Sequence, residues 1–335
     1  HTHRNVIFAN ENVPGEAFDY IRYPKLDQLF NLLDEHCKLV DGCDVITIPH
    51  NTNMGDGTTS DVEQESERQL SLRSRFERLV EIHQEKGNSE CLAPLGVTDE
   101  SDCNFETRLT KLSSPATQED YNSDEWEHMR ATYVRGLLMR GLAAYRRSGS
   151  GANNPLQLGI IGSTDGHAAT PGFVEESAWN GPVFGIGSLD KAMARRDWNP
   201  GGLVAIRAEE NTRESLFAAM KRREVYATSG PRIGLDFESD VSPLSCEAGG
   251  RPAAVTMGGD FSRGQPYFRL NVASDRVPLQ QIEVVKGKLQ DGIFRETVVT
   301  LWEGSATSQC IVWQDSDFVE EEPAFWYARV KEEAT

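Results

Sequence analysis

A compact apolar run followed by polar residues stands near the middle of the chain. Residues 158–162 read Leu-Gly-Ile-Ile-Gly, a pattern that is typical of a buried parallel strand. The next five residues, Ser163–His167, are small or polar. Because α/β proteins place their chemistry at the carboxyl ends of such strands, Asp165 and His167 are candidate site residues. In extended backbone two residues apart, their side chains would point to the same side. The alternative is a solvated turn in which Asp165 caps the segment that follows.

Helix-like and strand-like patterns alternate over about the first 230 residues. Apolar spacing predicts helices over residues 25–39, 66–86 and 123–147, and a further helix that Thr212 caps. Short apolar runs predict strands over residues 5–8, 43–48, 203–207 and 225–229. This alternation favours a mainly parallel sheet or a barrel.

The pattern changes near residues 231–259. From there to the end, short β-rich runs are separated by Gly, Asp and Pro, and helical spacing is missing; the runs cover residues 267–273, 282–285, 297–301, 311–313 and 325–330. Such a pattern predicts an antiparallel β module of sandwich type. We therefore expect two domains, residues 1–232 and residues 233–335, the second being the β-rich module.

Composition narrows the classes of partner. The chain has 52 acidic and 34 basic residues, a formal net charge of -18. This charge disfavours a sequence-independent nucleic-acid binder and a peripheral binder of anionic membranes. No apolar window is long enough to span a bilayer. The expected partner is a small-molecule substrate. Six cysteines are too few for a disulfide scaffold; Cys91 and Cys103 could pair or remain free thiols.

Three histidines lie at strand boundaries. His3 precedes the first predicted strand, and His50 and His167 each follow one. With Asp165 they would converge at one edge of the sheet. Imidazole and carboxylate groups are ligands for zinc, manganese or iron, and a bound metal of this kind activates water. The remaining internal histidines lie within predicted helices and are interpreted as surface or interface residues; they are His36, His83 and His128.

The segments around these residues resemble the PHP (polymerase and histidinol phosphatase) superfamily. The resemblance is closest to the family of unknown function numbered 3604 within it. It is carried by residues 3–8, by residues 48–51 (Ile-Pro-His-Asn) and by Asp165-Gly166-His167. It continues through residues 86–90, 210–217, 224–232, 257–260, 282–287 and 325–330, which covers essentially the whole chain.

The resemblance implies a partial, distorted β/α barrel of PHP type in residues 1–232. It also implies a centre of two or three zinc, manganese or iron ions that acts on phosphate esters. His3, His50, Asp165 and His167 would be metal ligands. The early ligand motifs of such proteins would lie upstream of His1. The chain therefore resembles a piece of a longer polypeptide, truncated at both ends, that holds about half of a metal centre and part of a barrel.

Two hypotheses about function follow. The first is a metal-dependent hydrolase, phosphoesterase-like, in which Asp165 and His167 are catalytic and metal-activated water attacks the substrate. Asn51, from its position in the loop after His50, is a candidate substrate contact. The alternative is a degenerate or non-catalytic binding or accessory module of the same fold.

Overall fold

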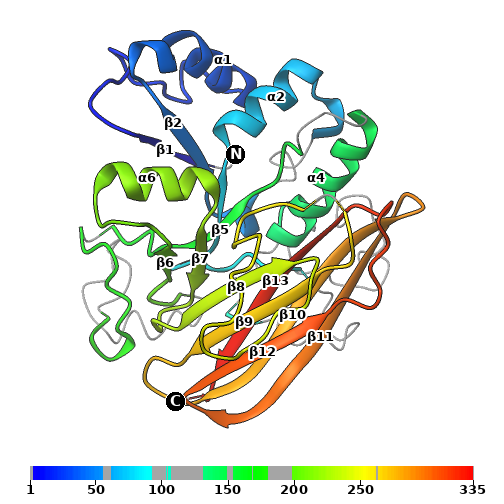
Figure 1. Cartoon of the computed structure of the whole chain (residues 1–335). Helices are drawn as coiled ribbons and strands as arrows, with labels where there is room; N and C mark the ends of the chain where they lie inside the picture. Colours follow the sequence, from blue (N-terminus) through cyan, green and yellow to red (C-terminus); the bar gives the residue numbers. More distant parts are fainter. Residues whose placement is uncertain are drawn as a thin grey trace, which may run out of the picture. The chain divides into compact units, whose positions relative to one another are not determined.

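The computed structural model describes residues 3–55, 62–92, 103, 105–106, 131–148, 154–167, 169–179, 198–261 and 263–334. The chain divides into two compact units, His1–Gly230 and Pro231–Thr335 (Figure 1). His1, His128 and residues 123–130 of the expected third helix lie outside the described residues. Each unit is described below by itself.

Four α-helices are described in the first unit: α1 (Leu26–His36), α2 (Glu67–Phe76), α4 (Val134–Ser148) and α6 (Arg213–Arg222). Short 3₁₀ turns lie at Leu39–Asp41, Thr52–Met54, Val62–Gln64 and Glu176–Ala178. The apolar stripe of α1 buries Phe30 and Leu33 in a cluster with Phe76 of α2. Thr212 caps α6 as expected, because its side-chain oxygen accepts a hydrogen bond from the Ser215 N–H.

The strands of the first unit form small sheets of mixed direction. They are β1 (Arg4–Phe8), β2 (Val45–Pro49), β3 (Leu79–Gln84), β4 (Gly87–Asn88), β5 (Gly159–Gly162), β6 (Leu203–Ile206) and β7 (Val225–Thr228). The pairs β1/β2, β3/β4 and β6/β7 are antiparallel, whereas β3/β5 is parallel. A single parallel bridge between Thr47 and Glu77 joins β2 to the residues before β3. The unit is therefore mixed α/β.

The mainly parallel sheet or barrel expected from the sequence is not what the described strands form. They make no closed barrel, and β3/β5 is their one parallel pair. The connection through α6 shows why alternation was misleading. The helix returns the chain to the end of β6 that it left, where the Arg207 N–H donates to the Glu224 carbonyl at 2.9 Å. A helix between two strands therefore leaves the direction of the second strand open.

The single helix expected over residues 66–86 is also wrong. Helix α2 ends at Phe76, and β3 begins at Leu79. Leu79 and Val80 are fully buried because β3 lies beside β5 and is covered on both faces. A strand that is buried on both faces carries a nearly continuous apolar run, and such a run mimics a helical stripe when it follows a real helix.

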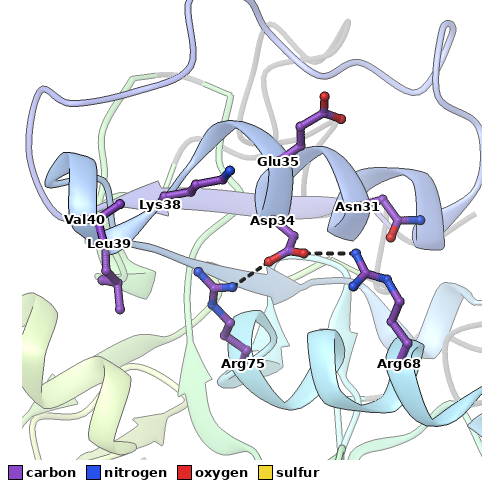
Figure 2. A pocket seen from close by; sticks show the side chains of 8 residues that line it. All are labelled: Asn31, Asp34, Glu35, Lys38, Leu39, Val40, Arg68 and Arg75. Atoms are coloured by element: carbon purple, nitrogen blue, oxygen red, sulfur yellow. Dashed lines mark hydrogen bonds and ion pairs between the residues drawn. The ribbon is translucent and has the colours of Figure 1, made fainter.

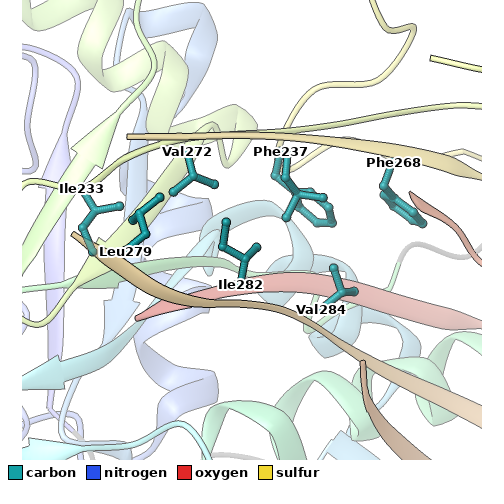
Figure 3. Packing of buried hydrophobic residues seen from close by; sticks show 8 residues of the cluster. Ile233, Phe237, Phe268, Val272, Leu279, Ile282 and Val284 are labelled. Carbon is teal, nitrogen blue, oxygen red and sulfur yellow. The ribbon is translucent and has the colours of Figure 1, made fainter. Parts of the chain in front are cut away.

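The second unit consists of two three-stranded antiparallel sheets, with strand orders β12-β9-β8 and β11-β10-β13. The strands are β8 (Gly234–Asp240), β9 (Tyr267–Ala273), β10 (Leu279–Gln290), β11 (Ile293–Ala306), β12 (Ser308–Gln314) and β13 (Ala324–Glu332). Residues from both sheets share one apolar core: Figure 3 shows Phe237 and Phe268 facing Ile282 and Val284. This arrangement is sandwich-like. Strand β8 was missed in the sequence, where residues 231–259 were treated as a boundary.

All six cysteines are paired. The disulfides are Cys37–Cys43, Cys91–Cys103 and Cys246–Cys310. Of the two alternatives for Cys91 and Cys103, the disulfide is the one formed. Pairing of the other four cysteines was not predicted. Among the helices that the structure describes, none is both long enough and apolar enough to cross a membrane.

Candidate functional site

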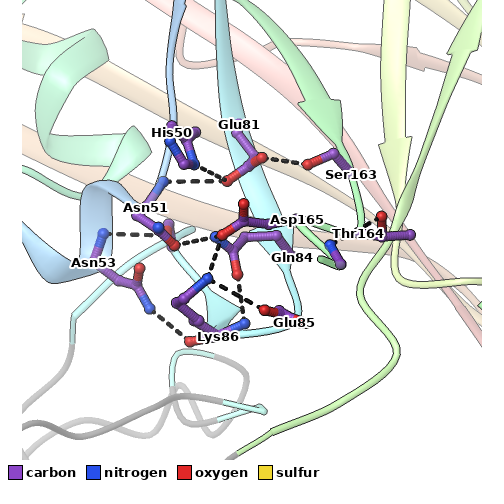
Figure 4. A network of polar contacts seen from close by, with 12 residues as sticks. His50, Asn51, Asn53, Glu81, Gln84, Glu85, Lys86, Ser163, Thr164 and Asp165 are labelled. Atoms are coloured by element: carbon purple, nitrogen blue, oxygen red, sulfur yellow. Dashed lines mark hydrogen bonds and ion pairs between the residues drawn. The ribbon is translucent and has the colours of Figure 1, made fainter. Parts of the chain in front are cut away.

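The ends of three strands bring the candidate residues together. His50 follows β2, the turn after β3 carries Glu85 and Lys86, and Asp165 follows β5 (Figure 4). Strands β3 and β5 are parallel, and β2 joins them through a parallel bridge, so their carboxyl ends lie at one edge. The Glu85 N–H donates to the Thr164 carbonyl at 3.1 Å, which ties the end of β3 to the segment after β5.

Glu81 of β3 lies at the buried end of this group. Its Oε1 accepts a hydrogen bond from the Asn51 backbone N–H at 3.1 Å and lies 3.9 Å from His50 Nδ1. Its Oε2 accepts a hydrogen bond from the Ser163 hydroxyl. The residue is only 2% exposed, and burial raises the pKa of its carboxyl to about 7 despite these two donors. Glu81 can therefore exchange a proton close to neutral pH.

His50 is buried beside a second histidine. Its ring centroid lies 5.5 Å from that of His3, and its backbone N–H donates to the His3 carbonyl at 3.2 Å. Burial lowers the pKa of His50, and the charges of Asp165, His3, Lys86 and His167 also act on it. The other three residues predicted as ligands, His3, Asp165 and His167, are therefore close enough to His50 to act on its charge.

Asp165 lies in the left-handed region, with φ of 49°, and not in extended backbone. The argument that placed Asp165 and His167 on the same side of a strand therefore fails. Both side chains nevertheless reach the turn after β3. Asp165 Oδ2 accepts hydrogen bonds from Gln84 Nε2 at 2.8 Å and from the Lys86 ammonium. Burial alone would raise the pKa of Asp165, but the bond to Lys86 and its charge outweigh burial, and the pKa is lowered.

His167 contacts the neighbour of Lys86. Its Nδ1 lies 3.6 Å from Glu85 Oε1, and its side chain is 40% exposed. Lys86 Nζ also donates to Glu85 Oε1, at 3.3 Å. Burial raises the pKa of Glu85 even with the Lys86 ammonium beside it. The imidazole of His167 is thus open to solvent, unlike that of His50.

Asn51 has a structural role that the sequence did not suggest. It is left-handed, with φ of 56°, and its side-chain oxygen accepts a hydrogen bond from Gln84 Nε2. Two residues on, Asn53 Nδ2 donates to the Lys86 carbonyl at 3.0 Å. Substrate contact by Asn51 remains a prediction, and its amide is already engaged in holding the loop against β3.

The interpretation of His83 as a surface or interface residue is wrong. His83 lies in β3 and is 5% exposed, whereas the side chain of His36 in α1 is 46% exposed, as a surface residue should be. His83 Nε2 lies 3.3 Å from Glu106 Oε2. Burial lowers the pKa of His83 to about 4, against a hydrogen bond with Asn199 that favours the charged form. The imidazole is neutral at physiological pH.

Four polar residues of the group were missed in the sequence: Glu81, Gln84, Glu85 and Lys86. All lie in the segment that was taken for the end of a helix. One signal could have found them. Gly87 adopts φ of 96°, a conformation that suits glycine and marks a turn between β3 and β4, so a glycine directly after Glu-Lys indicates a hairpin.

The donor groups are close but do not form a preformed metal cage. Among the residues that the structure describes, no three His, Cys, Asp or Glu side chains are arranged so as to hold a metal ion. His3, His50, Asp165 and His167 lie in one neighbourhood, with the Lys86 ammonium on Asp165. The Asp165 carboxylate is therefore paired with a cation of the protein itself, the Lys86 ammonium.

A separate pocket of about 640 Å³ lies beside α1 and α2 and contains none of the residues discussed above (Figure 2). Its polar floor is formed by Asp34, which accepts hydrogen bonds from Arg68 at 3.0 Å and from Arg75 at 2.7 Å. These contacts tie α1 to α2. No histidine, cysteine, serine or threonine is among the described residues that line this pocket, so the candidate site is the polar group at the strand ends.

Comparison with known proteins gives one match. The family model described as "Protein of unknown function (DUF3604)" matches residues 1–309. The chain belongs to this family. The resemblance to this family noted in the sequence is thereby confirmed. No curated protein and no solved structure gives a significant match.

Proposed function

We propose that this DUF3604 protein is a metal-dependent hydrolase, phosphoesterase-like, of the PHP superfamily. The observation that carries the proposal is the gathering of His50, Asp165 and His167 at one edge of the first unit, with Glu81 and Glu85 between them. Imidazoles and carboxylates that converge from separate strand ends are typical of hydrolytic metal centres. The motif resemblance to PHP proteins supports the same interpretation.

The chemistry of the group fits a divalent cation. Two carboxylates, Glu85 and Asp165, contact the Lys86 ammonium, and its charge also acts on a third, Glu81. The raised pKa values of Glu81 and Glu85 reflect burial, and the charge of Asp165 raises both further. Burial thus disfavours the charged form of these carboxylates, and a cation bound beside them would stabilise that form. The Lys86 ammonium already acts as a stand-in cation at Asp165, which shows that positive charge is accommodated there.

We assign the metal to His3, His50, Asp165 and His167, with zinc, manganese or iron as the ions that suit this donor set. When bound, the metal would supply Lewis acidity toward a substrate oxygen and toward water.

The protein's own residues would hold and move protons around that site. Glu81 has a pKa of about 7 and is fixed by the Ser163 hydroxyl and the Asn51 N–H, so it can accept or return a proton at neutral pH. The imidazole of His167 is exposed and can meet a substrate from solvent. The partner is a small molecule, for which we favour a phosphate ester. Asn51 remains our candidate substrate contact, through the loop that it holds.

The test combines metal analysis with a generic assay. The full natural protein is purified without chelator, its metal content is measured by mass spectrometry, and cleavage of p-nitrophenyl phosphate and bis(p-nitrophenyl) phosphate is followed with added Mn²⁺ or Zn²⁺. We expect bound transition metal, metal-stimulated cleavage, and loss of both in Asp165→Ala and His167→Ala. His36→Ala is the matched control, because His36 is an exposed histidine on α1 outside the group. A metal-free protein that cleaves neither ester with added metal would contradict the proposal.

One observation favours a second candidate, a non-catalytic binding or accessory module of the same fold. Asp165 is already neutralised by Lys86 and receives a hydrogen bond from Gln84. A group that satisfies its own carboxylate in this way can be stable without metal. Under this alternative the protein binds no transition metal, and Asp165→Ala changes its stability without changing any hydrolytic rate.

A further inference from the structure

Lys86 occupies the tight turn between β3 and β4 and points into the carboxylate group. Its backbone is fixed, because Gln84 pairs with Gly87 across the hairpin and the Lys86 carbonyl accepts a hydrogen bond from Asn53 Nδ2 at 3.0 Å. Its side chain is 17% exposed. The position of the ammonium can therefore change only by rotation of the side chain, while the turn stays in place.

Three groups surround the ammonium. Nζ donates to Asp165 Oδ2 and to Glu85 Oε1, the latter at 3.3 Å, and lies 5.4 Å from the centroid of the Trp198 ring. The first two contacts are with carboxylates, one of which is a proposed metal ligand. The third is a cation–π contact, which can hold an ammonium without a carboxylate.

We propose that Lys86 is a tethered competitor for the metal. Its ammonium occupies the cation position at Asp165 in the metal-free protein and must leave Asp165 when a divalent ion binds there. Two cations cannot share one carboxylate oxygen in a half-buried site without strong repulsion. The competition sets the metal affinity of the site. The inference rests on the proposed function, since it requires a metal site at Asp165.

The experiment measures Mn²⁺ affinity by titration calorimetry on the metal-free full protein. In Lys86→Met the competing charge is removed and the length of the side chain is kept, so we expect Mn²⁺ to bind about 10- to 100-fold more tightly than in the wild type. Lys86→Arg keeps the charge and should bind Mn²⁺ about as the wild type does. Lys221→Met is the matched control: Lys221 Nζ binds both Asp44 oxygens, at 2.5 and 2.6 Å, away from the group.

A second measurement uses the wild-type protein and does not depend on the Met variant folding. The side-chain ¹⁵Nζ signal of Lys86, assigned by its loss in Lys86→Arg, is followed during titration with diamagnetic Zn²⁺. We expect it to move with the same midpoint as metal binding, while the Lys221 signal stays in place.

The outcomes separate the two proposals. Metal binding to the wild type without tighter binding in Lys86→Met, or with an unmoved Lys86 signal, overturns the role of Lys86 and leaves the metal site standing. Failure of every variant to bind Mn²⁺ or Zn²⁺ overturns the proposed function together with the inference.

Discussion

Glu81 Oε1 lies 3.9 Å from His50 Nδ1, and both side chains are almost fully buried. Burial acts on the two in opposite directions. It raises the pKa of the Glu81 carboxyl to about 7 and lowers the pKa of the His50 imidazole. At neutral pH the pair therefore resists carrying two opposite charges, although the geometry would allow an ion pair. A buried acid of this kind leaves a signature in the dependence of stability on pH.

The first prediction concerns that signature. The folded-state pKa of Glu81, about 7, is above the ordinary value of 4.5, so between these values the folded protein binds the proton that the unfolded chain has released. The contribution of Glu81 to stability is therefore present below pH 4.5 and is lost as pH rises through 7. Glu81→Gln has no carboxyl to ionise, so this loss should vanish. From pH 5 to pH 8 its free energy of unfolding should therefore rise by about 2–3 kcal/mol relative to that of the wild type.

Urea unfolding in the presence of a chelator, at pH 5 and at pH 8, measures this difference. The chelator removes metal ions, so that the Glu81 carboxyl is measured in the metal-free protein. Glu81→Gln and wild-type curves that shift in parallel with pH would show that Glu81 ionises with an ordinary pKa.

The second prediction has the opposite sign. The pKa of buried His83 is lowered to about 4, so between pH 4 and pH 6.5 the unfolded chain binds a proton that the folded protein does not. Stability contributed by neutral His83 is lost as pH falls through this window. In ¹H–¹³C NMR spectra the imidazole of His83 should titrate with a midpoint near 4, well below the ordinary histidine pKa of 6.5. A His83 midpoint at or above 6 would mean that the imidazole is open to water.

Alternation of apolar and polar residues made strands of the second unit predictable. The run Tyr267–Ala273 was expected as a strand, and β9 has those bounds. Its alternate residues Phe268, Leu270 and Val272 are buried, because one face of the strand meets the core while the other does not. A period of two is visible in a sequence only when the two faces differ.

The same physics explains the failure at β3. This strand is covered on both faces, so apolar and polar residues do not alternate along it. Its apolar residues instead continue the helical spacing of α2, which precedes it. The site was predicted through His50 and Asp165, whose strand-end positions are local features. Gly87 could have marked the turn that carries Lys86. That Glu81 and Lys86 lie beside His50 and Asp165 could not be predicted, since this depends on which strand lies beside β5. That pairing is a long-range contact and leaves no local pattern.

The third prediction tests the packing at the end of β5. A Cβ on Gly162 would lie 2.6 Å from the Leu203 carbonyl oxygen and 2.8 Å from that of Thr228. Both neighbours are backbone atoms of β6 and β7 and cannot move independently. Gly162→Ala should therefore destabilise the protein by about 2–3 kcal/mol, measured by urea unfolding.

Gly166, four residues on, is the matched control for Gly162. A Cβ there would meet nothing closer than the Thr164 hydroxyl oxygen at 3.6 Å, an ordinary contact. Gly166→Ala should leave stability nearly unchanged. Equal effects of the two substitutions would mean that β5 does not approach the β6 and β7 backbones so closely.

The fourth prediction concerns the disulfide Cys246–Cys310 in the second unit. It joins the segment after β8 to β12 across a sequence separation of 64 residues. The loop-closure entropy that such a cross-link removes from the unfolded chain corresponds to about 4 kcal/mol, so the double Ala variant should lose stability of that order. For Cys37–Cys43, with a separation of 6 residues, the same entropy is about 2 kcal/mol. Urea unfolding of both double variants under oxidising conditions measures the difference. The contrary result is that removal of Cys246–Cys310 lowers the free energy of unfolding by no more than removal of Cys37–Cys43 does. That result would mean that the segments joined by the long bridge stay in contact in the unfolded chain, so that the bridge adds no constraint.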